Sequence, residues 1–95
     1  MYINGYYVYI MASKKNGTVY TGMTGNLRQR AEAHKKKTAS EFTKRYSARK
    51  LVYYERYDNE QKAKTRERQI KRWKREWKLR LIEEVNPGWK DLSGD

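Results

Sequence analysis

The segment from Tyr7 to Gly22 restricts the fold of this chain strongly. Two runs of apolar and aromatic residues, Tyr6–Met11 and Thr18–Gly22, flank a polar connector that ends in Asn16-Gly17. Asn-Gly is a strong signal for a tight turn because both residues adopt positive φ at low cost. The segment therefore predicts a β-hairpin.

Alternation along the strands assigns the side chains of this hairpin to two faces. Successive residues of a strand point to opposite sides of the sheet. Tyr9 is therefore expected on the face opposite to Val8 and Ile10. On the second strand, Tyr20 shares a face with Gly22. Taken alone, the two tyrosines are explained equally by a packed aromatic pair and by two edges of a functional site.

A helix is predicted after the hairpin, over Leu27–Lys37. Asn26 is a favoured N-cap residue, and Gln29 follows it at the spacing of a capping box. Arg30 and His34 are four residues apart, so their side chains can point at the same place. As alternatives to a functional role, Arg30 can be a solvated charge and His34 a cation favoured at the end of a helix.

The segment Lys35–Lys50 is basic and carries few apolar residues. Lys44 and Arg45 are candidates for contacts with phosphate groups, and Tyr46 is a candidate platform for a base or sugar. The alternative is a solvated loop with no binding role.

The second half of the chain predicts one strand and two helices. Leu51–Tyr57 is rich in β-branched and aromatic residues, as expected for a strand. Asp58 is predicted to cap a long helix, which a turn near Trp73–Arg75 divides and Asn86-Pro87-Gly88 ends. The fold class is therefore α/β (α+β), a small, mostly antiparallel three-stranded sheet flanked by helices in the order β-β-α-β-α-α. We expect one domain over residues 1–95, with a short tail from about residue 86.

Glu67 is the unusual residue of the long helical segment. Helical spacing predicts an apolar stripe, which consists of Ala63, Glu67, Ile70, Trp73, Trp77 and Leu81. A carboxylate in such a stripe is costly unless it is paired or binds a cation. Glu67 is thus either one half of an ion pair or a ligand for a divalent ion. The same segment is heavily basic, and Arg66, Lys71 and Lys74 are candidates for phosphate contacts.

Composition points to a polyanionic partner. The formal net charge is +12 in 95 residues. Nucleic acid is therefore the first partner we expect, with DNA preferred over RNA, and an anionic membrane surface is the second. The apolar stripe that Glu67 interrupts argues against a membrane partner. The chain has no cysteine. No signal peptide and no apolar run of about 20 residues is visible, so a cytoplasmic location is expected.

Taken together, these segments resemble the GIY-YIG endonuclease superfamily, and in particular its small single-domain members. The resemblance extends from about Tyr6 to Leu81. Tyr7-Val8-Tyr9 corresponds to the first motif and Tyr20-Thr21-Gly22 to the second, with Val8 and Thr21 where isoleucine is usual. No single motif is specific, but the ordered set with its spacing and its basic charge is.

The resemblance implies a site for metal-dependent hydrolysis of phosphodiester bonds, of the kind used in DNA repair, recombination or processing. Tyr9 would be the general base and Tyr20 would orient it or the water, while Arg30 would bind the scissile phosphate and His34 would relay a proton. Glu67 would hold Mg²⁺ or Mn²⁺. Gly22 would let the nucleic-acid backbone come close. The phenol of Tyr9 is expected to need nearby positive charge to lower its pKa.

The sequence also departs from the family pattern at Tyr7, where glycine is usual, and downstream of Glu67. Many members use an asparagine a dozen or more residues after the metal-binding glutamate, where this chain has Leu79, Arg80 and Leu81, and Asn86 is too far along. An alternative is therefore a catalytically weak or inactive module of the same fold that binds nucleic acid, and another is a basic RNA-associated protein without an active site. A bare domain of this kind also implies either low sequence specificity or a protein partner that supplies it.

Overall fold

Three antiparallel strands form the centre of the molecule. A computed structural model describes residues 4–36 and 48–93. Strands β1 (Tyr6–Ala12), β2 (Val19–Thr24) and β3 (Lys50–Tyr57) form one sheet in the order β2-β1-β3, so β1 has a neighbour on both sides. The predicted hairpin is confirmed as the β1–β2 pair, in which Tyr9 lies opposite Gly22.

The connector of the hairpin is wider than a two-residue turn. Ser13 N–H donates to the carbonyl of Thr18, and Gly17 N–H donates to that of Lys14. Asn16 has a φ of 59°, whereas Gly17 is not in the positive region. The expectation that both residues use positive φ is therefore correct only for Asn16, because the Ser13–Thr18 bond closes a longer loop.

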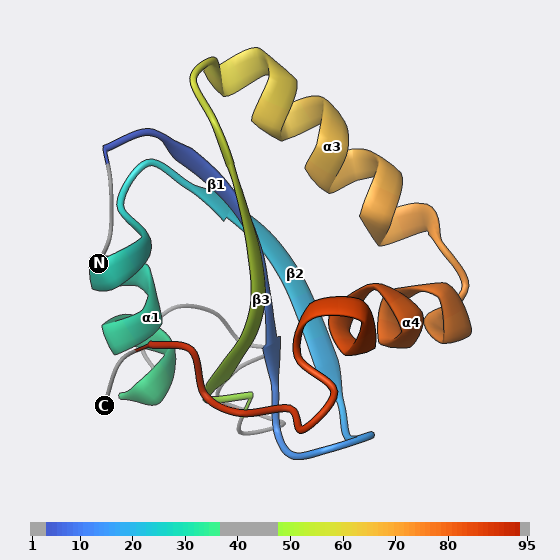
Figure 1. Ribbon diagram of the computed structural model, residues 1–95. Helices are drawn as coiled ribbons and strands as arrows, with labels where there is room; N and C mark the ends of the chain where they lie inside the picture. Colours follow the sequence, from blue (N-terminus) through green and yellow to red (C-terminus); the bar gives the residue numbers. More distant parts are fainter. Residues whose placement is uncertain (1–3, 37–47, 94–95) are drawn as a thin grey trace.

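Helices cover both faces of the sheet (Figure 1). Helix α1 (Leu27–Lys35) lies on one face, and helices α3 (Glu60–Arg72) and α4 (Arg75–Val85) lie on the other. The predicted α/β fold and the element order β-β-α-β-α-α are confirmed.

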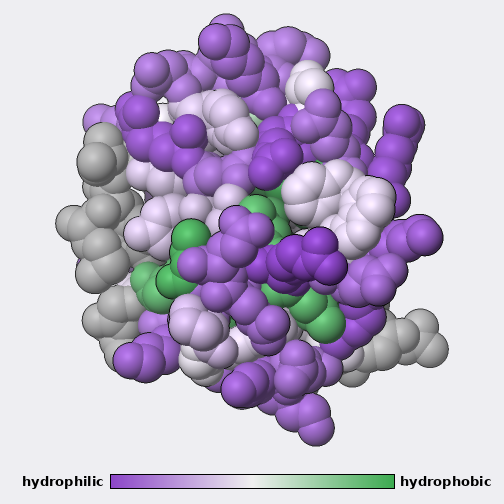
Figure 2. Space-filling view, turned by 45° about the vertical axis from the view of Figure 1, so that its right-hand side comes forward, coloured by the Kyte–Doolittle hydropathy of each residue, from purple (hydrophilic) through white to green (hydrophobic). Residues whose placement is uncertain are grey.

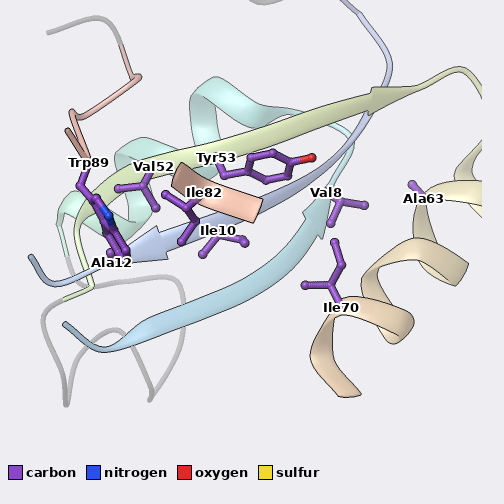
Figure 3. Close-up of a cluster of buried hydrophobic side chains, with 9 residues drawn as sticks. All are labelled: Val8, Ile10, Ala12, Val52, Tyr53, Ala63, Ile70, Ile82 and Trp89. Atoms are coloured by element: carbon purple, nitrogen blue, oxygen red, sulfur yellow. The ribbon is translucent and has the colours of Figure 1, made fainter. Parts of the chain in front are cut away.

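Each face of the sheet has its own buried cluster. The cluster under α3 and α4 contains Val8 and Ile10 of β1 together with Ile70 of α3 and Ile82 of α4, as Figure 3 shows. The cluster under α1 contains Tyr9 of β1 and Leu27 of α1. The side chains of β1 alternate between the two clusters as predicted, because the pleat sends successive residues to opposite faces.

The long helical segment differs from its prediction in two details. The N-cap of α3 is Asn59 instead of Asp58: the Asn59 side chain accepts the N–H of Lys62, while Asp58 forms an ion pair with Arg56. The predicted break near Trp73–Arg75 is confirmed, because Trp73 has an extended conformation. The break also turns α4 about its axis, so that Ile82 is buried and Trp77, predicted in the apolar stripe, is 49% exposed.

Candidate active site

Tyr9 lies at the centre of the candidate site. It is fully buried on the central strand, and its ring crosses over the neighbouring residue of β2, Gly22. A Cβ atom on Gly22 would lie 2.5 Å from the Tyr9 hydroxyl oxygen, well inside normal contact distance. Glycine at position 22 therefore makes room for the side chain of Tyr9.

Helix α1 brings two side chains to the Tyr9 hydroxyl. The Asn26 side chain accepts the N–H of Gln29 and fixes the start of the helix, as predicted. One turn on, Arg30 Nη1 donates to the Tyr9 hydroxyl at 3.4 Å, and the His34 Nε2 atom lies 3.0 Å from the same oxygen. The prediction that Arg30 and His34 point at one place is confirmed by these contacts.

Tyr20 completes the aromatic side of the site. Its ring centroid lies 5.3 Å from that of His34 and 6.4 Å from that of Tyr9. Strands β1 and β2 thus place their tyrosines on the same face of the sheet, against the histidine of α1. Unlike Tyr9, Tyr20 is only partly buried, so it lies between the interior and the solvent.

Burial determines the acidity of Tyr9. It raises the pKa of Tyr9 to about 12, although the hydrogen bond and the positive charge of Arg30 lower it. The positive charge of Arg30 acts on this pKa in the expected direction, but the loss of hydration outweighs one guanidinium. The phenol is therefore protonated at neutral pH.

His34 is neutral for related reasons. Burial and then the charge of Arg30 lower the pKa of His34 to about 4. Its Nδ1 atom is buried and has no hydrogen-bond partner in the described part of the chain. The interpretation of His34 as a cation at the end of a helix therefore fails, because a buried imidazole beside a guanidinium does not hold a proton at neutral pH. A neutral imidazole can accept the proton of Tyr9 at Nε2.

Glu67 comes from the helix on the opposite face of the sheet. Helix α3 packs against Val8 through Ala63 and Ile70, on the face of the sheet opposite to the cluster that contains Tyr9. The negative charge of Glu67 nevertheless reaches the site, where it is one of the influences that raise the pKa of Tyr9. The Glu67 side chain is 21% exposed and lies 3.3 Å from Lys71 Nζ.

The Glu67 carboxylate fits a hard divalent ion of the kind that keeps most of its water. No group of three or more histidine, aspartate or glutamate side chains converges among the described residues. A single carboxylate that solvent can reach is nevertheless a common protein ligand for Mg²⁺, with waters and phosphate oxygens as the other ligands. Glu67 meets this requirement, and a metal there would compete with Lys71 for the carboxylate.

Comparison with known proteins identifies the family of this chain. The model of the GIY-YIG catalytic domain matches residues 5–80. The chain belongs to the GIY-YIG family. A UPF0213 protein of Clostridium perfringens is 41% identical over 76 residues, which are 80% of this chain and 81% of that protein. A UPF0213 protein of Staphylococcus haemolyticus is 38% identical over 79 residues, which are 83% of this chain and 95% of that protein.

A solved structure shows the same fold. The solution structure of the UPF0213 protein BH0048 of Bacillus halodurans superimposes with a TM-score of 0.57 and covers 92% of each chain. The two sequences are 24% identical, so this similarity bears on the fold alone.

Arg66, predicted to contact phosphate, belongs to a separate network in this GIY-YIG domain. Its Nε atom donates to Glu55 at 2.6 Å, and its guanidinium lies 5.1 Å from the ring centre of Trp73. Tyr53 and Tyr57 also donate to Glu55. Arg66 is thus held by a carboxylate of β3. Glu55 was missed by the sequence reasoning, although its position between two tyrosines on one strand face was a signal.

Of the other residues of the two basic segments predicted to contact nucleic acid, the structure describes only Lys71 and Lys74. Lys71 pairs with Glu67, as described above, and Lys74 is exposed at the start of α4. Lys44, Arg45 and Tyr46 lie outside the described residues.

Asn86, the asparagine nearest to the expected position, has a structural role. It is 5% exposed, and its side-chain amide donates to the carbonyls of Val52 and Lys90. Its carbonyl oxygen accepts the N–H of Lys90. These bonds fasten the chain after α4 to strand β3, so the side chain is fully occupied.

None of the helices described is long and apolar enough to cross a membrane.

Proposed function

We propose that this chain is a metal-dependent endonuclease that hydrolyses phosphodiester bonds, with DNA as its substrate. The observation that carries the proposal is the meeting of Arg30 and His34 on the hydroxyl of Tyr9. The ring of Tyr9 packs in the cluster under α1, but packing alone does not require a guanidinium and a neutral imidazole on its hydroxyl. Family membership favours nuclease chemistry for this arrangement.

Arg30 would bind the phosphate that is cut. One of its nitrogens is used by Tyr9, which leaves further N–H groups of the partly exposed guanidinium for two phosphate oxygens. Such a fork is shorter and stronger than a neutral hydrogen bond, and it strengthens as negative charge develops on the phosphate. Arg30 would also position the phosphate above Tyr9.

Tyr9 and His34 would together remove the proton of the attacking water. With a pKa of about 12, Tyr9 does not supply a phenolate by itself at neutral pH. It can take a proton from water while it passes its own to His34 Nε2, 3.0 Å away. The phosphate would neutralise Arg30, which is one of the two causes of the low pKa of His34, and so would favour this transfer. Tyr20 would orient the water from the open side of the site.

Glu67 would hold a Mg²⁺ or Mn²⁺ ion. A bound divalent ion supplies Lewis-acid stabilisation of the phosphate and of the leaving oxygen. Lys71 would then lose its partner and become available to the nucleic-acid backbone. The basic residues of α3 would bind neighbouring phosphates, and a protein partner would supply specificity.

Nicking of supercoiled plasmid with Mg²⁺ tests the role of Glu67. We expect Glu67→Gln to abolish nicking and to leave DNA binding intact or slightly stronger, since the variant removes a negative charge. Glu60→Gln is a matched control, because it makes the same change at an exposed position of the same helix. Nicking by Glu67→Gln at the rate of the wild type would refute the assignment. A panel of linear, branched and single-stranded DNA and RNA, with and without Mg²⁺, would define the substrate.

A second candidate is a module of the same fold that binds nucleic acid without cutting it. The observation in its favour is that Asn86 is fully engaged in the tail, while Leu79, Arg80 and Leu81 occupy the expected place of the catalytic asparagine. This candidate predicts that the wild-type chain binds DNA and leaves plasmid intact with either Mg²⁺ or Mn²⁺.

A further inference from the structure

Helix α4 carries an apolar stripe on its outer side. Trp77, Leu81 and Val85 follow one another at four-residue steps and so share one face of the helix. Trp77 is 49% and Val85 67% exposed, and they are the exposed large hydrophobic residues of the described chain. Figure 2 shows pale and green side chains gathered among purple, hydrophilic ones on the side of the molecule that α3 and α4 share.

A shallow hollow accompanies this stripe. It has a volume of about 210 Å³ and lies between Trp73, at the end of α3, and the outer face of α4. Its polar lining consists of Arg80 and Glu84, one residue of each charge. The stacking of Arg66 on Trp73, and the 6.3 Å between the ring centres of Trp73 and Trp77, hold the aromatic wall in place.

The charge of α4 does not fit nucleic acid. Helix α3 has six basic and two acidic residues, whereas α4 has three of each. A polyanion would be drawn to α3 and gain little on α4. An apolar stripe with an aromatic anchor, flanked by charges of both signs, is instead typical of a surface that binds protein.

The order of the charges along α4 indicates what kind of protein would bind this face. Its first half carries Arg75, Lys78 and Arg80 with one acidic residue, Glu76, and its last turn carries Glu83 and Glu84 with no basic residue. The acidic last turn opposes the helix dipole, which favours basic residues at the end of a helix. A second helix with the same order, laid antiparallel, would place its acidic end beside the basic half of the first.

We propose that the outer face of α4 binds the same face of a second copy of this chain, with the two α4 helices antiparallel. Such a contact is isologous and closes as a dimer. With the two-fold axis at Leu81, Trp77 of one copy packs on Val85 of the second copy, and Arg80 comes within reach of Glu84 of the second copy. The hollow beside Trp73 gives room for the apolar side chains of the second helix. This proposal is independent of nuclease activity.

Sedimentation equilibrium of the full chain tests the contact. The wild-type mass is expected to rise from 11.5 kDa towards twice that value with concentration. Trp77→Ala should raise the dissociation constant of the dimer roughly tenfold or more, as truncation of a central tryptophan does. Lys64→Ala, an exposed change on α3, should leave it unaltered. Val85→Asp is a second variant at an exposed position that the fold tolerates, and it should have the same effect as Trp77→Ala.

Charge reversal tests the antiparallel arrangement. Copies that carry Arg80→Glu are acidic along this edge and should be monomeric alone, and so should copies that carry Glu84→Arg, which are basic along it. An equimolar mixture of the two should associate at least as tightly as the wild type. Circular dichroism of each variant would verify that it is folded.

Three results would overturn the proposal. The first is a wild-type chain that stays monomeric up to millimolar concentration. The second is a dimer that Trp77→Ala and Val85→Asp leave unchanged. The third is a mixture of the reversed variants that associates no better than each alone. Weaker nucleic-acid binding by Trp77→Ala with unchanged association would assign the stripe to nucleic acid instead.

Discussion

At the scale of single residues, the position of the Tyr9 side chain depends on the glycine at position 22. The ring of Tyr9 occupies the space that a side chain at position 22 would need. The hydroxyl then reaches Arg30 and His34, which come from a different element. A glycine in a strand interior usually weakens the strand, so its presence here is explained by the close approach of the tyrosine.

Gly22→Ala should therefore destabilise the protein and displace Tyr9. The new methyl group would lie 2.5 Å from the hydroxyl oxygen of Tyr9. Overpacking of this kind costs about 1–3 kcal/mol in the free energy of unfolding, which urea denaturation would measure. Gly25→Ala is the matched control, because its Cβ would lie 3.6 Å from the Tyr6 ring, an ordinary contact. Equal stabilities of the two variants would contradict the role given to Gly22.

His34 should make stability depend on pH between its two pKa values. The pKa is about 4 in the folded protein and 6.5 for an unperturbed histidine. As pH falls from 6.5 towards 4, the unfolded chain gains a proton that the folded chain does not, so stability is lost over that range and no further below it. The loss is about 3 kcal/mol.

The chain has one histidine, which makes this pH dependence measurable. The imidazole resonances in an NMR titration should shift with a midpoint near 4. The difference in unfolding free energy between the wild type and His34→Gln should shrink as pH falls from 6.5 to 4. A midpoint near 6.5, or a difference that stays constant with pH, would show that His34 is hydrated.

At the scale of elements, an ion pair fastens α3 to strand β3. Burial by itself would raise the pKa of Glu55, but hydrogen bonds from Arg66, Tyr53 and Tyr57 outweigh it and lower the pKa. The carboxylate thus gathers three donors from two elements. Because Arg66 also stacks on Trp73, this network fixes the end of α3 as well as its middle.

Arg66→Met should cost stability more than it costs nucleic-acid affinity. The variant leaves a largely buried Glu55 carboxylate without its charged partner, which we expect to lower the unfolding free energy by about 1.5–3 kcal/mol. Arg68→Met, at an exposed position of the same helix, should change stability little and weaken DNA binding at low salt. Thermal unfolding and a DNA titration of both variants would separate the two roles. If Arg66→Met is as stable as the wild type but binds DNA poorly, Arg66 contacts phosphate as the sequence predicted.

At the scale of the whole molecule, the sheet separates α1 from α3, the two helices that carry residues proposed to form one active site. Tyr9, Tyr20, Arg30 and His34 gather on the face covered by α1, and Glu67 belongs to α3 on the other face. The surface is divided as well, since α3 is strongly basic and α4 is neutral. The side proposed to bind a polyanion and the side proposed to bind protein are therefore distinct.

Local patterns in the sequence determined the elements and their order. Alternation in Tyr6–Met11 predicted both faces of β1, and the N-cap at Asn26 predicted the start of α1. The i, i+4 spacing of Arg30 and His34 predicted that they act at one place. These features depend on neighbours in the chain, which is why the sequence alone reveals them.

Only the tertiary structure decided the features that depend on distant residues. The pKa values of Tyr9 and His34 follow from burial by three elements, and no local pattern measures that burial. Arg66 is paired with Glu55, eleven residues away on a different element, although its sequence context is that of a phosphate ligand. The break after Trp73 turned Trp77 outward. The sequence thus determined the elements and the candidate residues of the site, and packing decided the protonation states and the partners of those residues, because hydration and distance are properties of the folded chain.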